Sequence, residues 1–140
     1  MKTAQFIPID FKTGEYSEQD LVRFDCFRVA KDKQRLSERI ISLCDGEDSG
    51  SKYFWELTSQ TLIYSANRIP EISADIVNID NAMKWGFGWD AGPFEMWDMI
   101  GVQKSTNRMR AEGKKIPEGV TEMLSLGRES FYSIDSGVKT

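Results

Sequence analysis

Apolar positions recur at helical spacing along most of the chain, most clearly over residues 51–68. Apolar and small side chains return there every three or four residues for about five turns. Trp55, Ile63 and Tyr64 widen the apolar face of this segment. The pattern predicts the longest and most buried helix of the molecule. It should end before Pro70, because proline disfavours helical backbone in the residue that precedes it.

Weaker helical patterns flank this segment on both sides. A capping-box spacing at 17–20 predicts the start of one helix, and the apolar stripe over 36–44 predicts a second. Beyond the long helix, Asn78 is expected to cap a further helix that runs to about Trp85 and stops at Gly86.

Proline starts and glycine stops recur in the second half of the chain. Pro93 lies where its missing N–H costs a new helix nothing, and Gly101 lies where that helix should end. Apolar residues at helical spacing predict two more helices after it, stopped by Gly113 and by Gly127.

No segment alternates apolar and polar residues for long enough to predict a sheet. The sequence therefore predicts an all-α domain of six or seven helices over residues 17–132. We expect residues 1–16 to be a linker or arm and residues 131–132 to pack back onto the domain. The tail, 133–140, should fray after Ser133.

Composition narrows the function classes. The chain has 140 residues, the size of one domain, and a formal charge of −4 with a pI near 4.9. This acidic balance argues against nucleic acid or an anionic membrane as the main partner, because both demand an excess of Lys and Arg. No apolar run approaches the roughly 20 residues of a membrane span, and the N-terminus has no export pattern. We therefore expect a cytoplasmic protein.

Histidine and cysteine, which often act as catalytic groups or metal ligands, are absent or scarce in this sequence. The sequence contains no histidine, so the commonest general base near neutral pH is missing. Cys26 and Cys44 are isolated and lack the spacing of a metal site or redox pair. We expect buried, neutral thiols and no metal site.

The segment 81–101 holds the most specific pattern in the chain. Its five aromatic residues could line an acyl or aromatic ligand pocket. Aromatic residues at helical spacing more often form a core or a protein interface, which is the stronger interpretation here. We therefore take as packing or interface candidates Trp85, Phe87, Trp89, Phe94 and Trp97.

Other residues of this segment suggest chemistry that has a simpler explanation. Gly86, Gly88 and Gly92 imitate a dinucleotide fingerprint, but a helix rather than a strand precedes them, which favours tight turning between two helices. Asp90, Glu95 and Asp98 gather three carboxylates, and the last two share a helix face as an acid/base pair would. Glu95 also lies in the first turn after Pro93, where a negative charge stabilises a helix, so a structural role is favoured.

A locally basic stretch follows the aromatic segment. It could meet the phosphates of a coenzyme, although a solvated helix face is the commoner explanation. Its residues are Lys104, Arg108, Arg110, Lys114 and Lys115.

The segment 80–101 resembles the helical C-terminal domain of NAD-dependent L-3-hydroxyacyl-CoA dehydrogenases of fatty-acid β-oxidation. The likeness runs upstream to Phe54 and Pro70-Glu71-Ile72, and downstream through Ile116-Pro117 to Ser130-Phe131-Tyr132, so that it covers most of residues 51–132. It implies the all-α fold of the 6-phosphogluconate and 3-hydroxyacyl-CoA dehydrogenase C-terminal domains.

The resemblance also implies what this chain lacks. In that family a Rossmann domain binds NAD and carries the catalytic histidine, whereas the helical domain supplies an asparagine from its first long helix. That asparagine lies about two dozen residues before the Ile-Asp pair that opens the signature. Counting back the same distance from Ile79-Asp80 leads to Trp55, so no catalytic or cofactor-binding residue carries over to this chain. NAD is implied only for the parent enzyme.

This departure and the many tryptophans make the chain most like the second, duplicated helical domain of multidomain β-oxidation proteins. The resemblance then implies a fragment that packs on the Rossmann and first helical domains of its parent as a pseudo-dimer, with a homo-oligomer of the fragment as a possibility. The alternative is an acyl-CoA-binding module built from the aromatic residues and the basic stretch.

Overall fold

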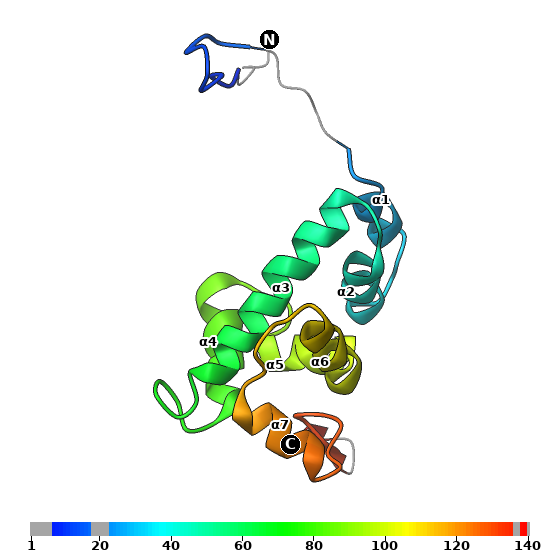
Figure 1. The fold of residues 1–140 in the computed structure, drawn as a ribbon, viewed down its shortest axis with the longest axis vertical. Coiled ribbons are helices and arrows are strands. Elements are labelled where there is room, and N and C mark those ends of the chain that lie inside the picture. Colours follow the sequence, from blue (N-terminus) through cyan, green and yellow to red (C-terminus); the bar gives the residue numbers. More distant parts are fainter. Residues whose placement is uncertain (1–6, 18–22, 136–137, 140) are drawn as a thin grey trace.

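The computed structural model describes residues 7–17, 23–135 and 138–139 of the chain. This part contains seven α-helices and one very short strand pair (Figure 1). The elements are α1 (Asp25–Lys31), α2 (Leu36–Asp45), α3 (Ser49–Asn67), α4 (Ile76–Phe87), α5 (Pro93–Ile100), α6 (Val102–Ala111), α7 (Glu118–Ser125), β1 (Ile134–Asp135) and β2 (Val138–Lys139). The all-α fold class and the number of helices predicted from the sequence are confirmed.

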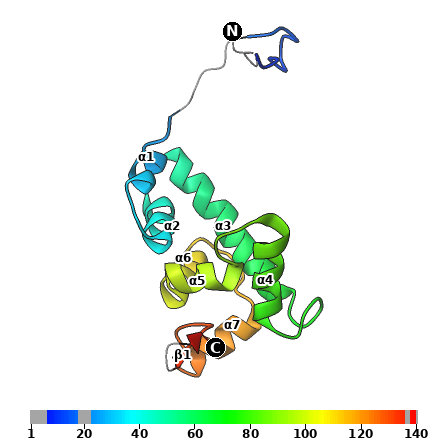
Figure 2. The ribbon, with the colours of Figure 1, turned by 180° about the vertical axis from the view of Figure 1, so that it is seen from behind.

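Helix α3 is the longest element, and the other helices are arranged around it (Figures 1 and 2). Asp48 caps its N-terminus by accepting a 2.8 Å hydrogen bond from the Ser51 backbone N–H. Trp55 and Leu62 point from α3 into the core, where they are 3% and 0% exposed. They meet residues of α2, α5, α6 and α7 in one cluster that also contains Ile40, Cys44, Trp97, Ile100, Val102, Met109, Ile116 and Val120.

Helix α4 begins earlier and ends later than the sequence predicts. Its N-cap is Asp75, whose carboxylate accepts a 2.8 Å bond from the backbone N–H of Asn78, so the expected cap residue is instead the donor. The helix continues through Gly86 and stops at Gly88, which adopts the left-handed conformation with φ 67°. The prediction of Gly86 as the stop was wrong because Gly88 is the residue that reverses the chain.

The connection from α4 to α5 requires a glycine at position 92. A Cβ atom there would lie 2.3 Å from the Cβ and Cγ atoms of Asp80 and 2.4 Å from its Cα. The turn can therefore press against α4 only because Gly92 has no side chain. Helix α5 then begins at Pro93 and ends at Gly101, as predicted.

The remaining glycine stops are also confirmed. Gly113 and Gly127 have φ of 77° and 73° and follow the ends of α6 and α7. Met109 and Val120 anchor these two helices in the core with 0% and 2% exposure.

The first predicted helix starts later than the capping-box spacing suggested. Ser17 is not helical, residues 18–22 lie outside the described part of the chain, and α1 begins at Asp25. The arm was expected over residues 1–16, of which 1–6 lie outside the described part of the chain. Residues 7–16 form a local turn in which Ile9 and Tyr16 are bridged and Gly14 has φ 75°.

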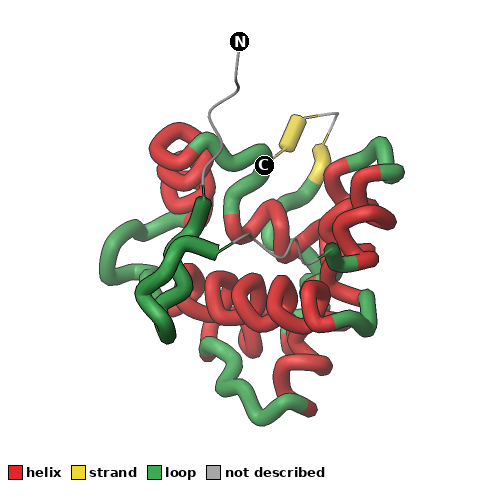
Figure 3. Tube along the Cα trace, turned by 90° about the horizontal axis from the view of Figure 1, so that it is seen from above, coloured by secondary structure: helices red, strands yellow, loops and turns green. Residues whose placement is uncertain are grey.

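The chain end returns to the domain, as expected for residues 131–132. The Phe131 ring lies 4.9 Å from that of Phe94 and 5.3 Å from that of Trp97, centroid to centroid. The prediction that the tail frays after Ser133 was wrong for β1 and β2, which pair antiparallel and appear as the yellow segments in Figure 3. A two-residue ladder is too short to leave an alternating pattern in the sequence.

Within the described residues, no helix is long and apolar enough to cross a membrane.

Candidate functional site

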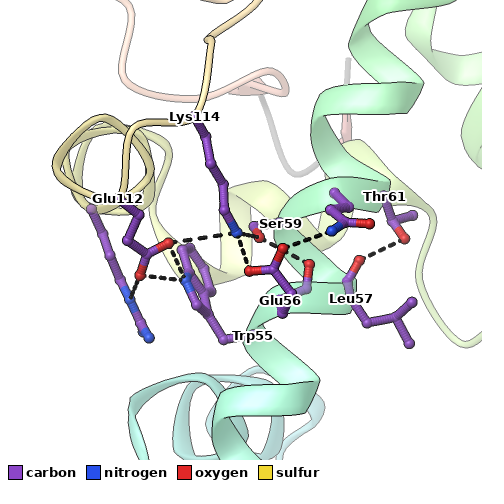
Figure 4. A network of polar contacts seen from close by, with 9 residues as sticks. Trp55, Glu56, Leu57, Ser59, Thr61, Glu112 and Lys114 are labelled. Carbon is purple, nitrogen blue, oxygen red and sulfur yellow. Dashed lines mark hydrogen bonds and ion pairs between the residues drawn. The ribbon is translucent and has the colours of Figure 1, made fainter.

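Trp55 occupies the most elaborate polar and aromatic environment in the domain. Its side chain projects from the second turn of α3 toward the end of α6, and it is 3% exposed. The indole N–H donates to both carboxylate oxygens of Glu112, each at 2.8 Å (Figure 4). The Arg108 guanidinium lies 4.1 Å from the ring centroid, within the range of a cation–π contact.

The residues around Trp55 also bind one another. Arg108 donates to Glu112 at 2.9 Å and to the Cys44 backbone carbonyl at 2.7 Å, which fixes the guanidinium over the indole. Partial burial raises the pKa of Glu112, but hydrogen bonds from Trp55 and Arg108 outweigh it, so the net pKa is lowered. Glu112 is therefore ionised at neutral pH, and it binds both the Trp55 indole N–H and the Arg108 guanidinium.

Lys114 extends this network to the surface of α3. Its ammonium group donates to Glu56 and, at 2.6 Å, to the Ser59 hydroxyl, and it lies 3.6 Å from Glu112 (Figure 4). The Lys114 side chain is only 16% exposed. The hydrogen bond from Lys114 is the main cause of the lowered pKa of Glu56.

The basic stretch predicted from the sequence is thus largely committed to partners within the domain. Lys104 pairs with Asp45 at 2.7 Å, and Arg108 and Lys114 belong to the Trp55 network. Arg110 and Lys115 remain exposed on the surface. The stretch is not gathered into one phosphate-binding patch.

The three carboxylates considered as acid/base groups do not share a partner. Two of them, Glu95 and Asp98, bind other parts of the domain. Glu95 accepts a 2.8 Å bond from the Gly92 backbone N–H at the start of α5 and pairs with Lys84 at 2.9 Å. Asp98 accepts the backbone N–H groups of Phe131 and Tyr132 at 2.8 and 3.0 Å. Asp90 is exposed in the preceding loop. The two helical carboxylates hold chain segments in place.

Sequence reasoning missed Asp80, the most buried carboxylate described. It is 1% exposed and accepts bonds from the Phe94 and Glu95 backbone N–H groups at 2.9 and 3.0 Å. The Tyr132 hydroxyl donates to it at 2.8 Å. Burial raises the pKa of Asp80, and these hydrogen bonds offset part of the rise. The available signal was an acidic residue on the α4 face that also carries Ile76.

The five aromatic candidates separate into three environments. Phe94 and Trp97 are 1% and 0% exposed, and the Trp97 indole N–H donates to the Ser105 hydroxyl at 2.8 Å. Trp89 is half-buried in the loop after α4. Trp85 and Phe87, near the end of α4, are 81% and 73% exposed. They do not form a common pocket.

The two cysteines are free and buried, as the sequence predicted. Burial raises the pKa of Cys44 to about 11 and also raises that of Cys26. No group of three or more potential metal ligands occurs within residues 7–17, 23–135 and 138–139.

An open groove lies between the C-terminal half of α3 and α7, with a volume of about 1260 Å³. Phe94, Phe131, Lys114 and Lys115 are among the residues that line it, together with apolar side chains from several elements. The apolar lining consists of Ile63, Ile69, Ile76, Ile116, Val120 and Met123.

These features define a class of protein: a helical domain in which Arg108 and Glu112 hold a buried tryptophan in place. A family model described as "3-hydroxyacyl-CoA dehydrogenase, C-terminal domain" matches residues 58–139. Because this match covers more than half of the chain, the protein belongs to the 3-hydroxyacyl-CoA dehydrogenase C-terminal domain family.

Relatives of the chain agree with this assignment. A protein of Bacillus subtilis described as "Probable 3-hydroxyacyl-CoA dehydrogenase" is 40% identical over 129 residues, which are 92% of this chain and 16% of the relative. Two proteins described as "Putative fatty acid oxidation complex trifunctional enzyme", from Rickettsia felis and Rickettsia prowazekii, are 40% and 38% identical over 45 residues. These matches span 32% of this chain and 6% of either Rickettsia protein. The chain thus corresponds to a small part of each relative.

Proposed function

We propose that the chain is a non-catalytic packing domain of an NAD-dependent 3-hydroxyacyl-CoA dehydrogenase of fatty-acid β-oxidation. It corresponds to the second, duplicated helical domain and packs on the Rossmann and first helical domains of its cytoplasmic parent as a pseudo-dimer. NAD binding and hydride transfer belong to the parent.

The observation that carries this proposal is the burial of Trp55 at the position where the family has a catalytic asparagine. By the sequence count, Trp55 stands where an active helical domain has its asparagine, three residues before the range matched by the family model. Position 55 therefore carries a buried indole, held by Glu112 and Arg108, in place of a polar side chain that could meet a substrate. The remaining candidate carboxylates, Glu95 and Asp98, bind backbone N–H groups of the domain.

The exposed aromatic residues support the packing role. Trp85 and Phe87 hold large apolar surfaces in water at the end of α4, next to the left-handed turn at Gly88. Exposed apolar patches of this kind commonly mark protein contacts. We assign Trp85 and Phe87 to the contact with the rest of the parent polypeptide.

A direct assay tests the non-catalytic part of the proposal. The purified chain is mixed with a 3-hydroxyacyl-CoA and NAD, and NADH formation is followed by absorbance. We expect no turnover above a reaction without protein, with a full-length dehydrogenase as the positive control. Turnover by the chain alone would overturn the proposal.

The packing part is tested in the full-length parent. Trp85→Ser should lower the thermal stability of the parent, whereas the same change in the isolated chain should leave stability nearly unchanged, because Trp85 is 81% exposed there. Equal effects in both proteins would contradict a contact made by Trp85 in the parent.

A second candidate function, the binding of acyl-CoA, is favoured by the groove between α3 and α7. Its apolar lining residues suit an acyl chain, and Lys115, which also lines it, is exposed. Calorimetric titration with a long-chain acyl-CoA tests it, with Lys115→Glu as the variant, because Lys114 is needed by the Trp55 network. Micromolar binding weakened by Lys115→Glu would favour this function, and no measurable binding would exclude it.

A further inference from the structure

Residues 7–17 form a small hairpin near the N-terminus, which we call the arm hairpin. The Asp10 N–H donates to the Glu15 carbonyl at 2.9 Å, and the Ser17 N–H donates to the Pro8 carbonyl at 3.1 Å. The hydrogen bonds described for this segment all join two of its own residues. In Figures 1 and 2 the arm hairpin, drawn in blue, stands apart from the helices.

The arm hairpin presents apolar side chains to water. Ile9 and Tyr16 are bridged, so their side chains lie on the same face, and Ile7, two positions before Ile9, extends that face. These three residues are 46%, 72% and 50% exposed, in that order. Phe11, in the turn, is 100% exposed. A lone two-stranded hairpin is marginally stable in water, so we expect another surface to cover these side chains.

The groove between α3 and α7 is an apolar surface that can cover them. Ile63, Ile69 and Met123 are among its lining residues, and all three are only partly buried. None of the described residues of the arm hairpin lines the groove. The hairpin and the groove are thus two apolar surfaces of one chain that face water in this structure.

The arm hairpin can reach the groove without a change in the helices. Phe24 fixes the chain at the start of α3, since a Cβ atom at Gly50 would lie 2.8 Å from the Phe24 Cβ. The eight residue steps from Tyr16 to Phe24 span at most about 26 to 29 Å. Tyr64, which lines the groove, lies fourteen residues beyond Gly50, or about 21 Å along the helix.

The arm hairpin and the groove also carry opposite charges beside their apolar surfaces. Lys12 follows Phe11 in the turn and is exposed. Glu118 and Glu122, one turn apart on α7, line the groove and are exposed. Phe11 in the groove would therefore bring Lys12 toward two carboxylates, which favours this orientation of the hairpin.

From these observations we propose that the arm hairpin folds back on its own chain and places Phe11 in the groove between α3 and α7. The structure described above is then the open state. Because the hairpin belongs to the same chain, its effective concentration at the groove can reach the millimolar range, so a weak contact suffices. This inference goes beyond the proposed packing function and does not depend on it.

Chemical cross-linking of the full chain tests the position of the arm hairpin. Thr13→Cys, in the turn, is combined either with Tyr64→Cys in the groove or with Tyr53→Cys, and a short bifunctional maleimide links the two introduced thiols. Tyr53 is the matched control, because it is a 72% exposed tyrosine of the same helix and lies nearer to the start of α3. The native Cys26 and Cys44 are buried and should not contribute.

A hairpin that only trails from its tether would reach the nearer thiol at position 53 more often. Docking predicts the reverse, with cross-linking to Tyr64→Cys at least about threefold faster than to Tyr53→Cys. Phe11→Ser should remove this preference and, because Phe11 is fully exposed, should leave the helices folded. Phe87→Ser, the same change at a 73% exposed position of α4, should keep the preference.

Limited proteolysis gives a second measurement that needs no introduced cysteine. Trypsin cleaves after Lys12, which the docked hairpin shields. Met123→Glu places a charge in the groove and should speed this cleavage at least about fivefold. Leu126→Glu, at a 68% exposed position just beyond α7, should leave the rate unchanged. Circular dichroism checks that both variants keep their helices.

Three cross-linking results would overturn the proposal: equal or faster reaction of Tyr53→Cys, a preference that Phe11→Ser leaves unchanged, or links formed only between two chains. Cleavage after Lys12 at the same rate in the native chain and in Met123→Glu would also overturn it. NADH formation by the isolated chain, in contrast, would overturn the proposed function and leave the docked arm hairpin standing.

Discussion

The Tyr132 hydroxyl donates a 2.8 Å hydrogen bond to the buried carboxylate of Asp80, although 52 positions separate the two residues. Asp80 also accepts the Phe94 and Glu95 backbone N–H groups at the start of α5. One side chain of α4 therefore holds both the N-terminus of α5 and the segment that follows α7.

Removal of the Tyr132 hydroxyl should weaken this connection. Tyr132→Phe keeps the ring but takes one donor from Asp80, so we expect the free energy of unfolding to fall by about 1 kcal/mol. Urea denaturation followed by circular dichroism measures the loss. Tyr53→Phe is the control, because Tyr53 is 72% exposed, and a loss of equal size there would contradict the assignment.

The close approach of Gly92 to Asp80 predicts a large cost for a single added methyl group. Gly92→Ala would bring a Cβ atom to 2.3 Å from the Asp80 side chain and 2.4 Å from its Cα. We expect a loss of about 2 kcal/mol or more, because the backbone must shift.

Gly86→Ala is the matched control for that substitution. Gly86 lies within α4, and an added Cβ would meet no atom within 4 Å. Alanine should raise the free energy of unfolding by about 0.5 to 1 kcal/mol there, because it favours helix more than glycine does. A stability loss in both variants would sink the steric explanation for Gly92.

Acid should destabilise the domain in part through Asp48. Hydrogen bonds from the Cys26 and Ser51 backbone N–H groups lower the pKa of Asp48 from 3.8 to about 2. A lowered pKa in the folded state means that Asp48 stabilises the fold above about pH 4 and that this contribution is lost as the pH falls toward 2. Glu56 and Glu112, whose pKa values are also lowered, act in the same direction.

Thermal unfolding between pH 5 and pH 2.5 measures this effect. The slope of melting temperature against pH should be smaller in Asp48→Asn, which titrates one group fewer. Asp80 acts in the opposite sense, because burial raises its pKa and its protonation in acid is therefore not penalised. A slope unchanged by Asp48→Asn would refute the role given to this cap.

The indole of Trp55 should be among the most costly side chains to remove. Trp55→Ala would leave a cavity in the core and deprive Glu112 of its indole donor, and we expect a loss of about 3 to 5 kcal/mol. Trp85→Ala, the change of an 81% exposed tryptophan, should stay within about 0.5 kcal/mol of the native value. Chemical denaturation compares the two, and similar values would contradict the burial of Trp55.

Both thiols should resist modification in the native state. Cys44 is 1% exposed with its pKa raised to about 11, and Cys26 is 5% exposed with its pKa raised by burial. A colourimetric thiol reagent at pH 8 should titrate two groups in denaturant and react at least about a hundredfold more slowly without it. Rapid reaction of the native protein would show that the thiols are accessible.

Local signals predicted most of the fold. The period of the long helix, the proline at 93 and the glycines at 101, 113 and 127 each act through the backbone of their own neighbourhood, so the sequence reveals them. The start of α4 could not be read in this way, because Asp75 and Asn78 are both good cap residues. The choice between Gly86 and Gly88 depends on which of them takes the left-handed conformation.

The candidate site was less accessible to sequence reasoning. The aromatic residues of 81–101 look alike in the sequence, yet Trp97 is fully buried and Trp85 is 81% exposed. Only the packing of α5 against the rest of the domain separates them. The roles of Asp80 and of Glu112 arise from partners 52 and 57 positions away, Tyr132 and Trp55, which no local pattern records.

The bond between Asp80 and Tyr132 also bears on how the domain forms during synthesis. Translation delivers α4 and α5 before Tyr132, so Asp80 of the emerging chain still lacks one of its three donors. Phe131, which covers Phe94 and Trp97, arrives in the same late step. The contacts that hold α4 and α5 are therefore complete only after Phe131 and Tyr132 have left the exit tunnel.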